Sequence, residues 1–164
     1  MKHISLFALL LTFSLNVLAQ AEREGVYGGI GLGVMSINYG NADNPTNASL
    51  QLGYHFNDHW AAELQYTDSL SDGKVTVQSG YYSSSVDVSI QTMAAYAVYR
   101  SPGQVYFKGR AGVLQEKVLG ASDSGLSVGL GLGFKIADSA AIELDATLIE
   151  QDVNYFSASL NFGF

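Results

Sequence analysis

The chain of 164 residues carries 15 acidic side chains against 8 lysines and arginines, which gives a net charge of −7. This acidic balance, without a basic stripe, argues against nucleic-acid binding, and we expect no nucleic-acid partner. Cysteine is absent, which excludes disulfides and thiolate metal sites, and the length suits a single domain.

The first residues have the layout of a secretory signal peptide. A weakly basic start at residues 2–3 precedes an almost uninterrupted apolar stretch over residues 4–18, and Ala19-Gln20-Ala21 follows. The apolar stretch is shorter than the roughly 20 residues that a membrane-spanning helix needs, which disfavours a helical anchor, the alternative interpretation. We predict an exported protein whose signal peptide, residues 1–21, is cleaved after Ala19 or Ala21.

The remaining residues, 22–164, alternate repeatedly between apolar and polar side chains and have no helical period. Since side chains of a strand point alternately to two faces, each alternating segment predicts a strand with one apolar face and one polar face. Eight such segments follow one another along the chain. The predicted strands are residues 26–38, 48–56, 59–67, 86–99, 105–116, 126–135, 140–149 and 155–164.

The two predicted faces differ in the size of their side chains. The polar face is rich in glycine and serine, which fit the narrow interior of an eight-stranded barrel, so we expect the bulky apolar face outside. A soluble barrel with an apolar interior is the alternative that this size difference disfavours. In the fourth predicted strand, the alternation assigns to the outer face Val88, Ile90, Thr92, Ala94, Tyr96 and Val98.

The connections between the predicted strands alternate in length. Polar segments over residues 39–47, 68–85 and 117–125 alternate with tight turns at 57–58, 101–104 and 137–139. This order is typical of an antiparallel up-and-down transmembrane β-barrel with short periplasmic turns and longer outer loops. Aromatic residues near the strand ends predict two interfacial girdles. Their members are Tyr54, Phe56, Trp60, Tyr96, Phe107, Phe134, Phe162 and Phe164 near the turns, and Tyr66 and Phe156 near the loops.

Three segments and the last residue resemble the small outer-membrane β-barrel family typified by the transmembrane domain of outer-membrane protein A. These are the glycine-rich residues 25–33, the segments 105–113 and 129–134, and Phe164. The resemblance covers nearly the whole exported chain and implies a monomer in the outer membrane of a Gram-negative bacterium, surrounded by outer-membrane lipids. It also implies that Phe164, together with Phe162, forms an assembly signal read by the barrel-assembly machinery.

Charged residues recur on the predicted inner face, a few positions above the short turns: Glu63, Lys108, Arg110, Glu143 and Asp145. Charges inside a membrane-spanning element are costly unless they pair or line a lumen. We therefore predict an ion network that plugs the lumen and has a structural role. A small gated channel is the alternative, because the family prototype has a comparable internal cluster, but eight strands leave little room for water.

Sites for catalysis, cofactors and metals are weakly supported by the sequence. Glycines at 29, 31 and 33, and again at 129, 131 and 133, recur every second residue with no helix after them, so they thin a crowded interior and do not form a nucleotide-binding loop. His55 and His59 flank a predicted turn without a third ligand or a nucleophile nearby. We expect no catalytic residue, no cofactor and no metal.

The longest predicted loop, residues 68–85, itself alternates around Val75 and Val77, which predicts a hairpin that extends the strands beyond the membrane. The related Ail- and Lom-like barrels use protruding loops for adhesion or serum resistance. That resemblance makes Tyr81 and Tyr82 candidate contacts to a host or surface ligand. A solvated hairpin without a partner is the alternative. The sequence thus favours a structural envelope protein, with a surface adhesin and a small channel as alternatives.

Overall fold

The computed structural model describes residues 24–37, 44–70, 73–79, 82–88, 90–118, 121–150 and 153–163. Ten strands make up almost all of this described part. They are β1 (Gly25–Ile37), β2 (Thr46–His55), β3 (Trp60–Ser69), β4 (Gly73–Ser79), β5 (Tyr82–Val88), β6 (Ile90–Arg100), β7 (Val105–Val118), β8 (Ala121–Ala137), β9 (Ala140–Glu150) and β10 (Val153–Gly163). Within the same residues, no helix is long and apolar enough to cross a membrane. The predicted signal peptide lies outside the described residues.

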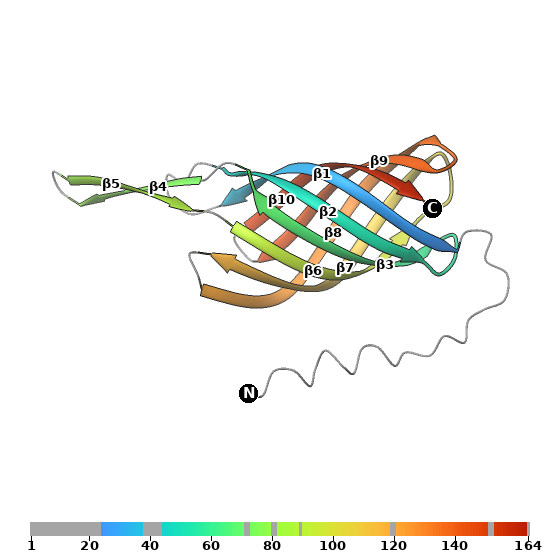
Figure 1. The fold of residues 1–164 in the computed structure, drawn as a ribbon, viewed down its shortest axis with the longest axis horizontal. Coiled ribbons are helices and arrows are strands. Elements are labelled where there is room, and N and C mark those ends of the chain that lie inside the picture. The colour runs from blue at the N-terminus through green and yellow to red at the C-terminus, as the bar shows by residue number, and fades with distance from the viewer. Residues whose placement is uncertain are drawn as a thin grey trace, which may run out of the picture.

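Eight of the strands close into a barrel in the order β1-β10-β9-β8-β7-β6-β3-β2. All neighbouring pairs are antiparallel, and β10 pairs with β1 to complete the ring (Figure 1). The predicted fold class is therefore confirmed. We call the end of the barrel with the tight connections 56–59, 101–104 and 138–139 the turn end, and the opposite end the loop end.

The predicted hairpin is present as a separate two-stranded sheet of β4 and β5, which Figure 1 shows beyond the loop end of the barrel. At its base, the Ser69 hydroxyl donates to the Ile90 carbonyl at 3.1 Å and accepts from the Ile90 amide at 3.0 Å. The predicted loop over 117–125 is wrong in extent, because β7 and β8 stay paired up to Val118 and Ala121. Its polar residues form a strand pair, since pairing, and not side-chain polarity, decides where a strand ends.

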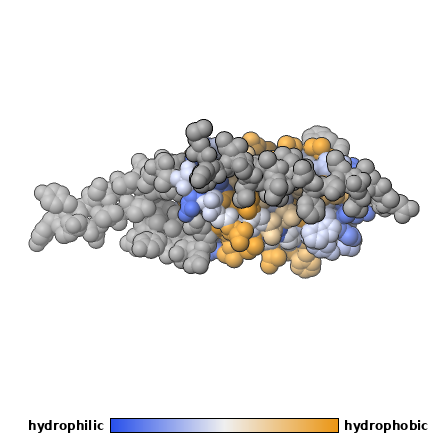
Figure 2. All heavy atoms as spheres, turned by 90° about the horizontal axis from the view of Figure 1, so that it is seen from below, coloured by the Kyte–Doolittle hydropathy of each residue, from blue (hydrophilic) through white to orange (hydrophobic). Residues whose placement is uncertain are grey.

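The barrel has its apolar side chains outside and its charges inside. Leu130 is 75% exposed on the outer wall, whereas Glu143 on the inner wall is 1% exposed. Figure 2 shows apolar side chains gathered over the middle of the visible wall, with hydrophilic residues to either side. A broad apolar belt of this kind on a closed barrel is the surface of a protein that is surrounded by lipid.

The predicted outward face of the fourth strand is wrong. Thr92, Ala94, Tyr96 and Val98, like Ile90, lie inside the barrel, while Met93 is 58% exposed on the outer wall. The reason is that the predicted strand 86–99 is two strands in different sheets: β5 pairs with β4, and β6 pairs with β3 and β7. Pairing with β3 and β7, and not the alternation read through residues 86–99, therefore determines which face of β6 lies inside.

This correction also changes the girdle of aromatic residues near the turn end. Tyr96 points into the lumen and is not part of the girdle. Tyr99 takes that place, because β6 pairs it with Trp60 of β3 on the outer wall. The two rings meet edge to face with their centroids 5.2 Å apart.

Candidate functional site

The lumen contains an ion network centred on Lys108, and the predicted charged residues are all part of it. The Lys108 ammonium lies 2.7 Å from Glu143 Oε2, 3.2 Å from Asp145 Oδ2 and 3.6 Å from Glu63 Oε2. Arg110 Nη1 lies 3.4 Å from Glu63 Oε1. Strands β3, β7 and β9 thus place five charges from separate parts of the sequence at one level of the barrel.

Arg100, the last residue of β6, is a sixth member that the sequence analysis missed. Its Nε lies 2.8 Å from Glu143 Oε1, and its Nη2 lies 3.4 Å from Glu63 Oε2. It was missed because the predicted fourth strand ended at residue 99, with its even-numbered positions on the outer face, so Arg100 was not considered as a lumen residue. Two cations against three carboxylates was the signal that a third cation was needed. With Arg100 the network has three cations and three carboxylates, so its formal charge is zero, as burial requires.

Two tyrosines that the sequence analysis also missed complete the hydrogen bonding of the carboxylates. The Tyr27 hydroxyl donates to Glu63 Oε2 at 2.7 Å, and the Tyr106 hydroxyl donates to Glu143 Oε1 at 2.6 Å. The Arg100 guanidinium also lies over the Tyr27 ring, 4.8 Å from its centroid. The inward parity of both tyrosines was the available signal. Each glutamate of the network therefore has a neutral donor in addition to its cations.

Glycines between the interacting strands make these contacts possible. Across β7, β8 and β9, Gly133 separates Tyr106 from Glu143, and Gly131 separates Lys108 from Asp145. A Cβ at Gly133 would overlap the Tyr106 ring, and one at Gly131 would overlap Asp145 Oδ1. Long side chains of β7 therefore pass over the glycines of β8 and reach acceptors on β9. The predicted role of these glycines, which is to leave space in a crowded interior, thus has a specific use here.

The upper part of the network is anchored by Arg110. Its Nη1 donates to Gln65 Oε1 at 2.6 Å, and its Nε donates to Thr147 Oγ1 at 3.1 Å across Gly129. Its guanidinium also lies 4.7 Å from the centroid of the Tyr96 ring. Tyr96 therefore contacts the ion network from inside the lumen and does not belong to the aromatic girdle at the membrane interface.

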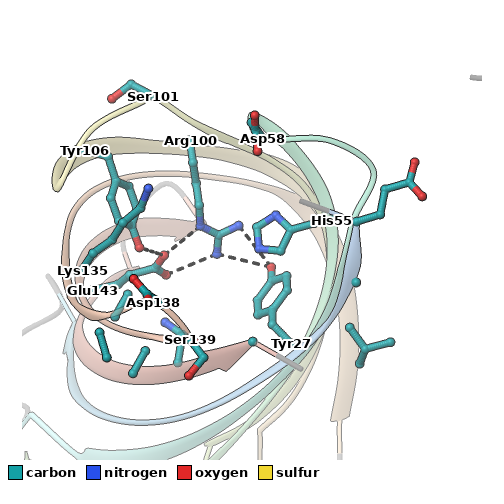
Figure 3. Close-up of a pocket in the computed structure, with 18 residues that line it drawn as sticks. Tyr27, His55, Asp58, Arg100, Ser101, Tyr106, Lys135, Asp138, Ser139 and Glu143 are labelled. Carbon is teal, nitrogen blue, oxygen red and sulfur yellow. Dashed lines mark hydrogen bonds and ion pairs between the residues drawn. The ribbon is translucent and has the colours of Figure 1, made fainter. Parts of the chain in front are cut away.

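Between the network and the turn end lies a cavity of ≈ 300 Å³, which we call the vestibule (Figure 3). In Figure 3, Arg100 bridges Glu143 and Tyr27 at its inner end, and rim residues such as Asp58 and Ser139 surround it. The vestibule thus ends at the ion network.

A group of buried apolar side chains lies towards the loop end of the lumen, and we call it the apolar layer. Its members are all buried and come from five strands: Met35, Ile90, Leu114, Ile149 and Tyr155. The apolar layer is not among the features predicted from the sequence. Ile90 belongs to the strand whose face was misassigned, and the other members stand among polar residues on the inner face.

The other predicted positions are distributed as follows. Phe162 is exposed on the outer wall of β10, and Phe164 lies outside the described residues, as does Tyr81. Tyr82 is the first residue of β5. Among the described residues, no group of three side chains could hold a metal ion. His55 packs against the Tyr27 ring with centroids 4.6 Å apart, whereas His59 faces Tyr99 at 5.9 Å.

Comparisons with known proteins agree with this architecture. A family model described as outer membrane protein beta-barrel domain matches residues 5–164. No curated protein matches the chain by sequence.

Several solved structures share the fold. Neisserial surface protein A is 17% identical, covers 86% of this chain and 97% of its own, and has a TM-score of 0.59. Ail, the attachment invasion locus protein of Yersinia pestis, is 20% identical, with 85% and 95% covered and a TM-score of 0.51. The N-terminal β-barrel domain of Pseudomonas aeruginosa OprF is 13% identical, with 87% and 100% covered and a TM-score of 0.54.

Proposed function

Because the chain belongs to the family of outer membrane protein β-barrel domains, we propose that it is a monomeric, structural component of a Gram-negative outer membrane with a closed lumen. The observation that carries the proposal is the double closure. The buried ion network lies across the lumen near the turn end, and buried apolar side chains lie near the loop end, so we infer that each closes the lumen at its level. A solute would have to displace both.

The ion network supports a structural role because its members hold one another from different strands. Glu143 of β9 is within 2.8 Å of both a β6 and a β7 cation, and Glu63 of β3 joins the same cations. Separating buried, paired charges leaves an uncompensated charge, which costs several kcal/mol. We infer that the network fixes the register of the barrel, and we assign no catalytic role, since its charged groups are engaged with one another.

In this proposal the turn end faces the periplasm, because outer-membrane barrels have short periplasmic turns. The chain is exported by its signal peptide and inserted by the barrel-assembly machinery, which reads Phe164 and Phe162. Outer-membrane lipids then surround the exposed belt.

Fractionation and solute flux test the proposal together. We expect the protein in the outer-membrane fraction, and we expect vesicles that contain it to swell in an arabinose gradient no faster than empty vesicles. A general porin in matched vesicles is the positive control. Recovery in the soluble periplasm contradicts the membrane role, and rapid swelling contradicts the closed lumen and favours the channel alternative.

A second candidate function is surface attachment through the β4–β5 hairpin. The observation that favours it is the separate sheet beyond the loop end, together with the fold shared with a protein named for attachment and invasion (Figure 1). Tyr81 and Tyr82 are the proposed contacts with a host or surface ligand, and Tyr82 is the first residue of β5.

A deletion that leaves the barrel intact tests this second function. Replacing residues 72–88 by a short turn keeps the Ser69–Ile90 clamp at the base. Loss of cell attachment with unchanged amounts of folded barrel is the expected result, and Tyr81→Ser with Tyr82→Ser should reproduce it. Attachment equal to that of the intact protein contradicts the role of the hairpin.

A further inference from the structure

The outer wall of the barrel has a groove that crosses the strands from β3 to β10, by way of β6, β7, β8 and β9. Its volume is ≈ 640 Å³, within the range of about 300–1,000 Å³ that is typical of small-molecule sites. The small residues that line it belong to β6, β7 and β9: Ala97, Gly109, Ala111 and Ala146. Larger apolar residues line the rest of the groove, with Trp60 at one end and Phe156 at the other.

The register of the barrel explains why a groove forms here. Gly109 on β7 pairs with Leu130 on β8, which pairs with Ala146 on β9, so Leu130 stands 75% exposed between two small residues. In the next outward-facing row towards the loop end, Ala97 pairs with Ala111. A Cβ at Gly109 would meet nothing within 4 Å, so the space above this glycine is open. Because alanine side chains end at Cβ, the neighbouring row does not fill that space.

The groove runs obliquely from the turn end towards the loop end. Trp60 is the first residue of β3, next to a tight turn, whereas Phe156 is close to the start of β10 at the loop end. Rows of paired residues rise across the wall because the strands of such barrels are tilted by roughly 35–45°. Five strand spacings of about 4.8 Å give a length of about 24 Å. The groove is therefore longer than one layer of lipid chains, which occupies about half of a 30 Å hydrocarbon core.

The chemistry of the lining indicates what the groove can hold. At the turn end lie the Trp60 indole and the Tyr99 hydroxyl, on rings that meet edge to face with centroids 5.2 Å apart. Tryptophan and tyrosine of this kind sit at the level of lipid headgroups. Of the described residues that line the groove, the one cation is Arg110, and its side chain points into the lumen. A suitable occupant thus has a long apolar body and a polar end beside the two aromatic rings.

We propose that the groove binds one phospholipid of the periplasmic leaflet, with its headgroup at Trp60 and Tyr99 and one acyl chain over Gly109 and Ala97. The groove is part of the apolar belt that faces lipid, so lipid is the material that covers it. Apolar atoms beside a void lose dispersion contacts, and small residues let a neighbouring chain approach closely enough to restore them. The choice of leaflet rests on the proposed function, in which the turn end faces the periplasm. This lipid is held at a defined site, unlike the other lipids around the belt.

Fluorescence quenching tests the site, because Trp60 is the one tryptophan of the chain. Purified protein, freed of lipid in a mild detergent, is titrated with a phosphatidylethanolamine whose acyl chain carries bromine, which quenches tryptophan on contact. Quenching should reach half of its maximum at a lipid mole fraction at least tenfold lower than random mixing of lipid and detergent around the belt would require. Quenching that only follows the mole fraction overturns the proposal.

Two identical substitutions on the outer wall form a matched pair. Ala97→Leu fills the groove and should raise the half-maximal mole fraction at least tenfold. Ala158→Leu adds the same side chain on β10, where the residue is exposed and pairs with Leu144 and Leu32 away from the groove, and should leave the titration unchanged. Heat-modifiable gel migration confirms that each variant is folded. Equal titrations of the two variants overturn the site, as does a dimer in sedimentation that Ala97→Leu dissociates, since a second copy would then occupy the groove.

The position of the bromine tests the orientation of the lipid. Bromine near the carbonyl end of the chain should quench Trp60 more strongly than bromine near the terminal methyl group, because the headgroup lies at the turn end. The reverse order contradicts the proposed orientation. These titrations are made in detergent, so their outcome depends neither on the cellular location of the protein nor on a closed lumen. A failure of the proposed function is therefore distinguishable from a failure of the lipid site.

Discussion

The Tyr106 hydroxyl donates a 2.6 Å hydrogen bond to Glu143 Oε1 from two strands away, across Gly133. In the N-terminal half of the chain, the Tyr27 hydroxyl donates to Glu63 in the same way, across Gly53. Because a tyrosine, a glycine and a glutamate recur in this order on β1–β3 and on β7–β9, both glutamates of the ion network are held by the same device.

Gly133→Ala should destabilise the barrel by about 1–3 kcal/mol, the usual cost of overpacking a filled interior. The new Cβ would fall on the ring of Tyr106 and push its hydroxyl away from Glu143. The matched control is Gly109→Ala, because a Cβ there meets nothing within 4 Å. Urea unfolding in lipid vesicles measures both, and equal stability of the two variants contradicts the crossing role of Gly133.

Tyr106→Phe should cost about 1.5–3 kcal/mol, the range for a hydrogen bond to a charged group. The ring remains and only the donor to the buried Glu143 carboxylate is lost. Tyr99→Phe removes a hydroxyl from the outer wall, where the ring packs against Trp60, and should change stability little. The same urea titration measures the difference in stability between Tyr106→Phe and Tyr99→Phe. Equal stability of the two variants would show that Glu143 does not need the tyrosine hydroxyl in addition to its cations.

Arg100→Met should destabilise the barrel by about 3–5 kcal/mol, because it leaves buried carboxylates without one of their cations. Arg100 contacts both Glu143 and Glu63 and is 8% exposed. Lys135→Met, at the rim of the vestibule, removes the same charge outside the network and should have a small effect. If both variants unfold at the same urea concentration, Arg100 is not part of the buried network.

The inward face of β6 can be read directly with spin labels on the cysteine-free chain. A label at Met93→Cys should be relaxed strongly by oxygen dissolved in the lipid, since this residue lies on the outer wall. A label at Thr92→Cys should be protected, because Thr92 faces the lumen. Stronger relaxation at Thr92→Cys than at Met93→Cys would contradict the structure and would favour the outward face that the sequence pattern alone predicts.

Most of the architecture is readable from the sequence because strands of a membrane barrel alternate strongly. The parity of Ile30 and Leu32 on β1, or of Leu130 and Leu132 on β8, predicts the outer wall correctly. The same parity placed Glu63, Lys108 and Glu143 inside. These positions are determined by local alternation within one uninterrupted strand.

The inner face of β6 could not be predicted from the sequence, because its alternation is compatible with either face pointing into the lumen. Val86 and Val88 belong to the hairpin sheet, whereas Ile90 starts a strand of the barrel, and both faces of that strand carry apolar side chains, with Met93, Ala95 and Ala97 on the face opposite Ile90. The choice is made by pairing with β3 and β7, which sets Tyr99 against Trp60 and Val98 against Arg110. The inward positions of Arg100, Tyr96 and Ile90 therefore depend on long-range register, which a local pattern does not contain.

Planar-bilayer recording tests the double closure most directly. We expect no steady conductance from the intact protein. We also expect none from Arg100→Ala, which weakens the ion network, or from Leu114→Ala, which weakens the apolar layer, because the other closure remains in each variant. The double variant, if folded by heat-modifiable gel migration, should conduct. A steady conductance from the intact protein, or one that appears fully with either single variant, would contradict a lumen closed at two levels.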